Sequence, residues 1–363
     1  DVRVTHSNGS LGLNGDLNIG KTGIHLSTAQ NPEGHGPEFV TSVTASTFHL
    51  ADFGIYPKTP TTPDTSTKKS SKSKTIQVFS DHPLSFEFLK ENEFALKLDI
   101  KELVGTDFVL TDLDIDATLE DSMLRINPAK LTYADGAISA ESRIDASGST
   151  PEIMLKVAAE DIDVGGVLSH IPMPGLLGGH LNIAADLSSR GSSPRQIASS
   201  LTGEVGFAIE NGKIKKLADL VGADALDFVT TARKLNEYEK LNCLAIVFEF
   251  DNGIATSKAI VADTPKLRTH GMGTINLINE TVDIGLHPQA KRRRLAGSSP
   301  VQIKGPLSNP SVRKLPLREA TELYGTIFLP FVFLPARALG YVWHSMGNDK
   351  LEPTPCLLKA LGS

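Results

Sequence analysis

The sequence has 363 residues, a formal net charge of −6 and a mean hydropathy of −0.08. This acidic balance excludes the basic face that nucleic-acid-binding proteins need, so we expect no nucleic acid among the partners. The 31 glycines and 21 prolines favour a turn-rich β protein. The length allows two or three compact domains or one extended sheet.

Short strands punctuated by glycines are predicted over residues 1–56. The first residues already alternate as a strand and no signal peptide precedes them, so we expect this segment to be the end of a larger sheet. Residues 57–75 are rich in Pro, Ser, Thr and Lys, a composition that predicts a flexible surface loop.

The middle of the chain alternates apolar and polar residues with a period of two. The clearest runs are Val205–Glu210, Ile246–Asp251 and Leu267–Leu277, and an Asn-Gly pair follows each of the first two. Asn-Gly between alternating runs is a strong signal for a β-hairpin. Because little except turns separates the runs, the pattern predicts an antiparallel meander rather than a parallel α/β sheet.

Helices are predicted at three places. Ser193–Ser200 begins with a serine cap and has Pro194 at the first helical position. Leu217–Tyr238 carries apolar residues at spacings of three and four, which indicates an amphipathic helix. Arg318–Tyr341 is a strongly apolar helical segment that prolines interrupt. The nearest candidate for a membrane span within the chain, Ile327–Val342, is too short to cross a bilayer.

No pattern in the sequence predicts catalysis, a cofactor or a metal site. Gly271-Met-Gly273 lacks the third glycine of a dinucleotide loop, and His170 and His180 lack the spacing of metal ligands. We therefore expect no enzyme activity. The basic run Lys291–Arg294 has two interpretations, a solvated hairpin loop or a contact with anionic lipid headgroups.

The two cysteines, Cys243 and Cys356, are too far apart in the sequence for a local metal knuckle. From composition alone they are either one long-range disulfide or two buried thiols.

Several short phrases, made mostly of turn residues, occur in an order that resembles the C-terminal region of the AsmA family of bacterial envelope proteins. The similarity extends over about residues 76–315, whereas residues 1–56 match only in their general pattern of short β-strands. The phrases are Phe79-Ser-Asp-His-Pro-Leu84, Gly178-Gly-His-Leu181 with Arg190-Gly-Ser-Ser-Pro194, Ser200-Leu-Thr-Gly-Glu204 with Asn211-Gly212, Asn242-Cys243 with Asp251-Asn-Gly253, His270-Gly-Met-Gly273 with Asn276-Leu277, and Pro300-Val-Gln-Ile-Lys-Gly-Pro306 with Asn309-Pro-Ser-Val312.

The resemblance implies a mainly β fold, an elongated antiparallel sheet curled into a hydrophobic groove (a β-taco), with a few short helices and a C-terminal apolar helical segment. The expected domains are then 1–56, the end of an upstream β-groove segment; 57–75, the loop; 76–315, the AsmA-like β-groove domain; and 316–363, the apolar helix and tail. The family's pattern also implies a disulfide between Cys243 and Cys356.

Proteins of this family look like bridges that carry phospholipid between the inner and outer membranes. The resemblance therefore implies a periplasmic lipid-transfer protein, anchored in the inner membrane by an N-terminal helix that this chain lacks. Its expected partners are phospholipid, a membrane at each end and an outer-membrane protein. The alternative is a periplasmic scaffold that assists or regulates outer-membrane protein assembly.

Large apolar residues on the inner positions of the strands predict an uncovered trough, which a soluble protein rarely tolerates unless a ligand fills it. The alternative is a closed sandwich in which the same residues form a core. The residues expected to line one lipid groove are Phe94, Leu96, Leu98, Leu113, Ile115, Leu181, Ile183, Phe207, Ile246, Phe248, Ile275 and Ile284.

The dense apolar segment Thr326–Met346 also has two interpretations. It is either a buried core helix or a helix that closes the end of the groove or rests in a membrane interface. In the second case the membrane contacts are Phe331, Phe333, Tyr341 and Trp343.

Overall fold

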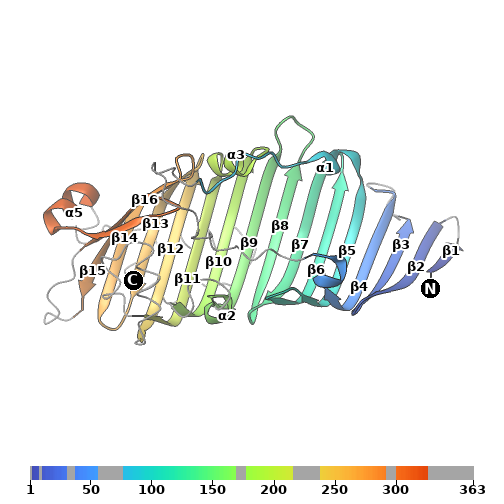
Figure 1. Ribbon diagram of the computed structural model, residues 1–363, viewed down its shortest axis with the longest axis horizontal. Coiled ribbons are helices and arrows are strands. Elements are labelled where there is room, and N and C mark those ends of the chain that lie inside the picture. The colour runs from blue at the N-terminus through green and yellow to red at the C-terminus, as the bar shows by residue number, and fades with distance from the viewer. Residues whose placement is uncertain are drawn as a thin grey trace, which may run out of the picture. The chain divides into compact units, whose positions relative to one another are not determined.

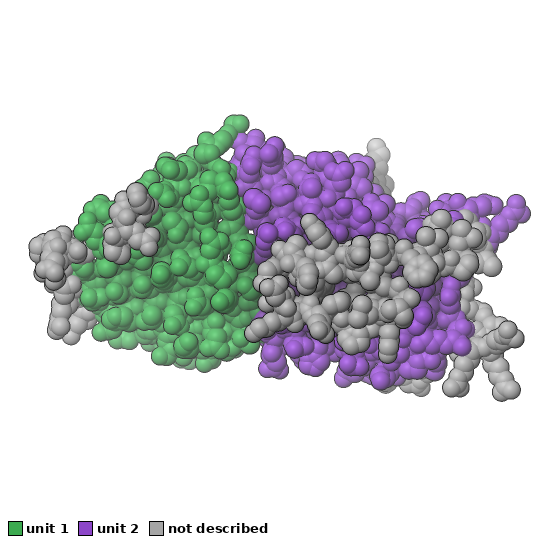
Figure 2. Space-filling view, turned by 180° about the vertical axis from the view of Figure 1, so that it is seen from behind, with its two compact units in different colours: residues 1–76, 86–133, 138–149 green, residues 77–85, 134–137, 150–363 purple. Residues whose placement is uncertain are grey.

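The computed structural model describes residues 2–7, 10–30, 37–55, 77–168, 177–215, 238–291 and 300–325 (Figure 1). The described residues form seventeen strands and a few short helices. They fall into two compact units, drawn in different colours in Figure 2. Unit 1 comprises residues 1–76, 86–133 and 138–149, and unit 2 comprises residues 77–85, 134–137 and 150–363.

In unit 1 the strands pair in the order of the chain. Strands β1 to β4 pair antiparallel with their neighbours, and so do β5 to β7. The elements are β1 (Val2–Ser7), β2 (Ser10–Ile19), β3 (Thr22–Gln30), β4 (Phe39–His49), the 3₁₀ turn η1 (Leu50–Phe53), α1 (Glu87–Glu91), β5 (Phe94–Val104), β6 (Val109–Glu120), β7 (Met123–Tyr133) and β8 (Gly136–Asp145).

One pair of strands departs from the predicted meander, because β4 and β5 run parallel. A parallel pair needs a crossover of a dozen residues or more between its strands. The connection here runs from residue 50 to residue 93, so the chain has ample length for that crossover.

In unit 2 each strand from β9 to β17 pairs antiparallel with the next, as the alternation predicts. The elements are β9 (Glu152–Asp163), α2 (Val164–Leu168), β10 (Leu177–Arg190), α3 (Pro194–Ser199), β11 (Thr202–Lys215), β12 (Tyr238–Asp251), β13 (Ile254–Asp263), β14 (Leu267–Asn276), β15 (Thr281–Ala290), β16 (Val301–Pro306), β17 (Ser311–Lys314) and α5 (Leu317–Tyr324).

The two Asn-Gly pairs behave differently. Asn252 and Gly253 have φ angles of 47° and 76° and form the tight turn between β12 and β13, as predicted. The hairpin predicted at Asn211-Gly212 is wrong, because β11 continues through both residues to Lys215. Asn211 has a φ of 50° and asparagine tolerates that left-handed conformation, so here the pair marks an irregularity inside a strand.

The predicted helix at Ser193–Ser200 is confirmed as α3. Its cap is Ser193, whose Oγ accepts a hydrogen bond from the amide of Gln196 at 3.3 Å, and Pro194 opens the helix. The loop at 57–75, most of the predicted helix at 217–238 and the apolar segment after residue 325 lie outside the described residues. The division into domains at these points stays a prediction.

Within the described ranges, no helix has the length and apolar character to cross a membrane.

Candidate functional site

The five groove residues predicted in unit 1 lie on one face of its sheet. Residues directly opposite one another on paired strands project to the same face. Leu98 of β5 is opposite Ile115 of β6, and Ile100 is opposite Leu113. Because side chains two positions apart along a strand share a face, this face carries Phe94, Leu96, Leu98, Leu113 and Ile115.

The apolar face of unit 1 is partly packed as a core. Ile100 and Leu113 are 4% and 6% exposed and form a buried cluster with Ala45. Half-buried side chains pack around the cluster, Ile115 among them. Phe94, Leu96 and Leu98 are half-buried, so this part of the face keeps contact with solvent.

The seven groove residues predicted in unit 2 also share one face. In β10 to β12, Ile183 is opposite Phe207, and Phe207 is opposite Ile246. Ile246 and Phe248 then pack in one apolar cluster with residues of β14 and β15. The seven residues are Leu181, Ile183, Phe207, Ile246, Phe248, Ile275 and Ile284.

This face of unit 2 is apolar without being fully buried. Phe248 is 7% exposed, whereas Phe207 is 36% exposed and the other five predicted residues are half-buried. On the opposite face of the same strands, the small side chains of Ala208 and Ala245 are both 1% exposed. Phe207 and the five half-buried side chains are therefore the part of this face that remains open to a ligand, and an exposed apolar surface can mark a binding groove or an interface.

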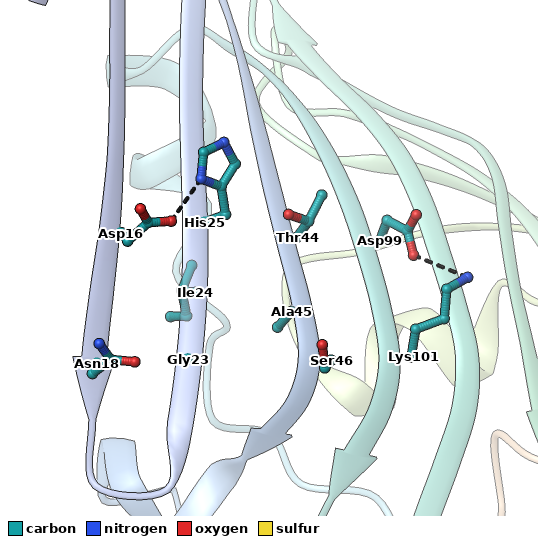
Figure 3. A pocket seen from close by; sticks show the side chains of 10 residues that line it. All are labelled: Asp16, Asn18, Gly23, Ile24, His25, Thr44, Ala45, Ser46, Asp99 and Lys101. Atoms are coloured by element: carbon teal, nitrogen blue, oxygen red, sulfur yellow. Dashed lines mark hydrogen bonds and ion pairs between the residues drawn. The ribbon is translucent and has the colours of Figure 1, made fainter. Parts of the chain in front are cut away.

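A shallow pocket of about 470 Å³ lies in unit 1, over strands β2 to β5 (Figure 3). Its charged side chains are paired within the pocket: His25 Nδ1 lies 2.8 Å from Asp16 Oδ1, and Lys101 Nζ lies 3.4 Å from Asp99 Oδ1. The four side chains are all more than half exposed, and such ion pairs contribute little to stability. Around this pocket and elsewhere in the described residues, no three His, Cys, Asp or Glu side chains are placed to hold a metal ion.

A buried carboxylate that the sequence analysis missed stands at the turn between β14 and β15. Glu280 is 6% exposed and accepts hydrogen bonds from the amides of Val78 at 2.6 Å and Phe79 at 3.1 Å. Arg195 Nη2 lies 3.0 Å from the same carboxylate, and Arg195 Nε lies 2.7 Å from Asp81. The hydrogen bond from the amide of Val78 has the largest effect and lowers the pKa of Glu280. Burial opposes it, and the amide of Phe79 and the charge of Arg195 lower this pKa further.

A second polar cluster attaches α5 to β15. The hydroxyl of Tyr324 donates to Asp283 Oδ1 at 2.6 Å, and Gln302 Nε2 donates to the same oxygen at 2.8 Å. Lys304 Nζ lies 2.7 Å from the other oxygen of Asp283. Burial and the hydrogen bond to Asp283 raise the pKa of Tyr324. The ring of Tyr324 covers Gly285, where an added Cβ would lie 2.7 Å from the ring.

The structure describes only one of the remaining predicted residues, Cys243. Cys243 lies in β12 and is 5% exposed, whereas Cys356 is outside the described residues, so their disulfide stays a prediction. The predicted membrane contacts also lie outside the described residues: Phe331, Phe333, Tyr341 and Trp343.

Comparison with known proteins gives one family and one relative. The model of the AsmA family matches residues 5–260. The AsmA family protein YhjG of Escherichia coli (strain K12) is 22% identical over 208 residues, which cover 57% of this chain and 30% of that protein. The chain thus spans less than a third of the relative's length. No solved structure matches.

Proposed function

This chain belongs to the AsmA family, and we propose that it is a lipid-transfer protein whose apolar sheet faces hold the acyl chains of phospholipid. The family is linked in general to lipid transport and membrane homeostasis. The observation that carries the proposal is the half-exposed apolar face of unit 2, where large side chains from six consecutive strands point the same way.

Acyl chains match this face in both chemistry and shape. Burying each methylene of a lipid gains about 0.8 kcal/mol, and a run of strands offers the chain a continuous row of apolar contacts. Val205, Ile246 and Ile284 pack against the buried centre of the face at Phe248 and Ile260. The face is thus firm enough to keep its form while its outer side chains, such as Phe207, contact the ligand.

The wider function follows the same proposal. The protein carries phospholipid between the inner and outer membranes from a place in the periplasm, held in the inner membrane by an N-terminal helix outside these residues. Phospholipid and the two membranes are its partners, together with an outer-membrane protein. The segment Thr326–Met346 contacts the outer membrane or that partner, and no reaction is catalysed.

Site-specific photo-crosslinking tests the proposal. A benzophenone side chain placed at Phe207 should crosslink phospholipid in cells, because this position is on the apolar face and exposed. The matched control is Thr274, which is exposed on the opposite face of β14, next to Ile275. Lipid adducts of equal yield at both positions, or at neither, would contradict the proposal. A protein adduct at Phe207 in place of lipid would favour the scaffold function.

A further inference from the structure

Two lysines lie directly opposite one another where β11 ends and β12 begins. Lys213 of β11 is paired in register with Lys240 of β12, and both are exposed. Like charges directly opposite on antiparallel strands destabilise the pair. Among the described residues, neither ammonium group is within ion-pair distance of a carboxylate. An anion bound between the two lysines would relieve this repulsion.

The side chain of Lys213 is held in place. Gly178 of β10 is opposite Lys213, and an added Cβ at Gly178 would lie 2.8 Å from Cε of the lysine. The aliphatic part of the Lys213 side chain therefore lies over Gly178, because glycine has no side chain to fill that space. At the other end, Nζ of Lys213 stands 5.6 Å from the centre of the Tyr238 ring, a cation–π contact. A side chain ordered in advance loses less entropy when it binds a ligand.

Two nearby carboxylates, Glu239 of β12 and Asp263 of β13, are paired with other cations. Glu239 precedes Lys240, and its Oε1 lies 3.7 Å from Nζ of Lys266 in the turn between β13 and β14. Asp263 lies within 3.2 Å of both Arg268 and Lys291. Both carboxylates are thus paired with cations other than Lys213 and Lys240.

We propose that Lys213 and Lys240 form a binding site for a phosphate group. Two ammonium groups on neighbouring strands supply several N–H donors to the oxygens of one phosphate, in charge-assisted hydrogen bonds. The Tyr238 ring, 44% exposed, lies beside them as an amphipathic contact. The phosphate belongs to a lipid headgroup, because both ammonium groups are exposed and can reach an anionic membrane surface.

This inference rests on the proposed lipid function for the source of the phosphate, since free phosphate offers the same chemistry. A lysine near an anionic membrane surface contributes about a fivefold gain in affinity. Replacing both lysines with glutamine, as Lys213→Gln with Lys240→Gln, should therefore weaken binding of the full chain to phosphatidylglycerol vesicles about 20-fold. The matched control is Lys258→Gln with Lys304→Gln, which removes the same charge from lysines paired with Glu249 and Asp283 and should change binding little.

A geometric variant makes the test sharper. Gly178→Ala keeps both lysines but displaces the stem of Lys213, so vesicle affinity should also fall by several-fold. If the control variant loses as much vesicle affinity as the Lys213→Gln, Lys240→Gln variant, the binding is general charge attraction and the site is overturned. Wild-type affinity in the Lys213→Gln, Lys240→Gln variant would overturn it as well.

Two further measurements distinguish free phosphate from a lipid headgroup as the ligand, and distinguish the lysine site from the proposed lipid-transfer function. If inorganic phosphate protects Lys213 and Lys240 from amine-reactive labelling while vesicles do not, the leaflet is overturned as the source and the phosphate site stands. Binding of diacylglycerol, which has no phosphate, should be unchanged in the double variant. If the wild-type chain does not bind diacylglycerol, that result counts against the proposed groove function. The vesicle-binding experiments then decide on the lysine site by themselves.

Discussion

Arg195 and Glu280 join two parts of the chain that are 85 residues apart in sequence, with Nη2 of the arginine 3.0 Å from the carboxylate. The carboxylate of Glu280 also accepts hydrogen bonds from the amides of Val78 and Phe79, some 200 residues before it. Arg195 in turn donates to the carbonyl oxygen of Phe79 at 3.0 Å. The carboxylate of Glu280 and the side chain of Arg195 thus help to fix the segment from residue 77 within unit 2, together with a backbone hydrogen bond from Leu84 to Ser192.

The first prediction is that this attachment depends on pH. Hydrogen bonds from Val78 and Phe79 hold the pKa of Glu280 below its ordinary value of 4.5. A carboxylate with a lowered pKa in the folded state stabilises the fold above pH 4.5, and this stabilisation is lost as pH falls through the lowered value. Hydrogen exchange of residues 77–85 should therefore be faster in Glu280→Gln than in the wild type at pH 7.

The difference between these two proteins should disappear once the pH falls below the lowered pKa of Glu280, where its carboxylate is protonated. The control is Glu249→Gln, which removes an exposed carboxylate paired with Lys258 and should leave exchange in this segment unchanged. Equal exchange of residues 77–85 in Glu280→Gln and the wild type at pH 7 would rule out the attachment.

The second prediction separates the packed centre of the apolar face from its open part. Phe248 is 7% exposed within a buried cluster, so Phe248→Ala should lower the free energy of unfolding by about 3–5 kcal/mol. Phe207 is 36% exposed, and Phe207→Ala should cost about 1 kcal/mol. Urea denaturation measures both. A similar large loss for the two variants would mean that the face is a closed core, against the lipid-binding proposal.

The third prediction concerns the contact of Tyr324 with Gly285. Because an added Cβ would meet the ring at 2.7 Å, Gly285→Ala should push Tyr324 away and cost about 1–3 kcal/mol. Tyr324→Phe removes only the hydrogen bond to Asp283 and should cost about 1 kcal/mol. In a Tyr324→Ala background the alanine at position 285 should cost little more. Full additivity of the two changes would disprove the contact.

The sequence was most informative where local rules decide the structure. Period-two alternation placed Phe207, Ile246 and their partners on one face, because the pleat of a strand leaves no other choice. The cap at Ser193 and the turn at Asn252-Gly253 are equally local. Asn211 misled because the same left-handed conformation that closes a hairpin also fits an irregularity inside a strand.

What the sequence could not give are relations between distant segments. Nothing near Glu280 indicates that its carboxylate will meet residues 78 and 79, since such contacts arise only when the sheet brings its strand ends together. The parallel pairing of β4 and β5 is of the same kind, because strand direction depends on the long connection between them. The opposition of Lys213 and Lys240 likewise required the register of β11 on β12.

The last prediction is that Cys243 and Cys356 form a disulfide. Cys243 lies in the middle of the sheet of unit 2, opposite Glu210 and Asp263. A bond from there would close a loop of roughly 110 residues, and the chain-entropy model gives such a loop about 4–5 kcal/mol of stabilisation. Denatured protein treated with an alkylating agent should gain no adduct without reductant and two adducts after reduction, as measured by intact mass. Two adducts without reductant would refute the bond. Replacing both cysteines with serine should lower the free energy of unfolding, and reductant should then have no further effect on the variant.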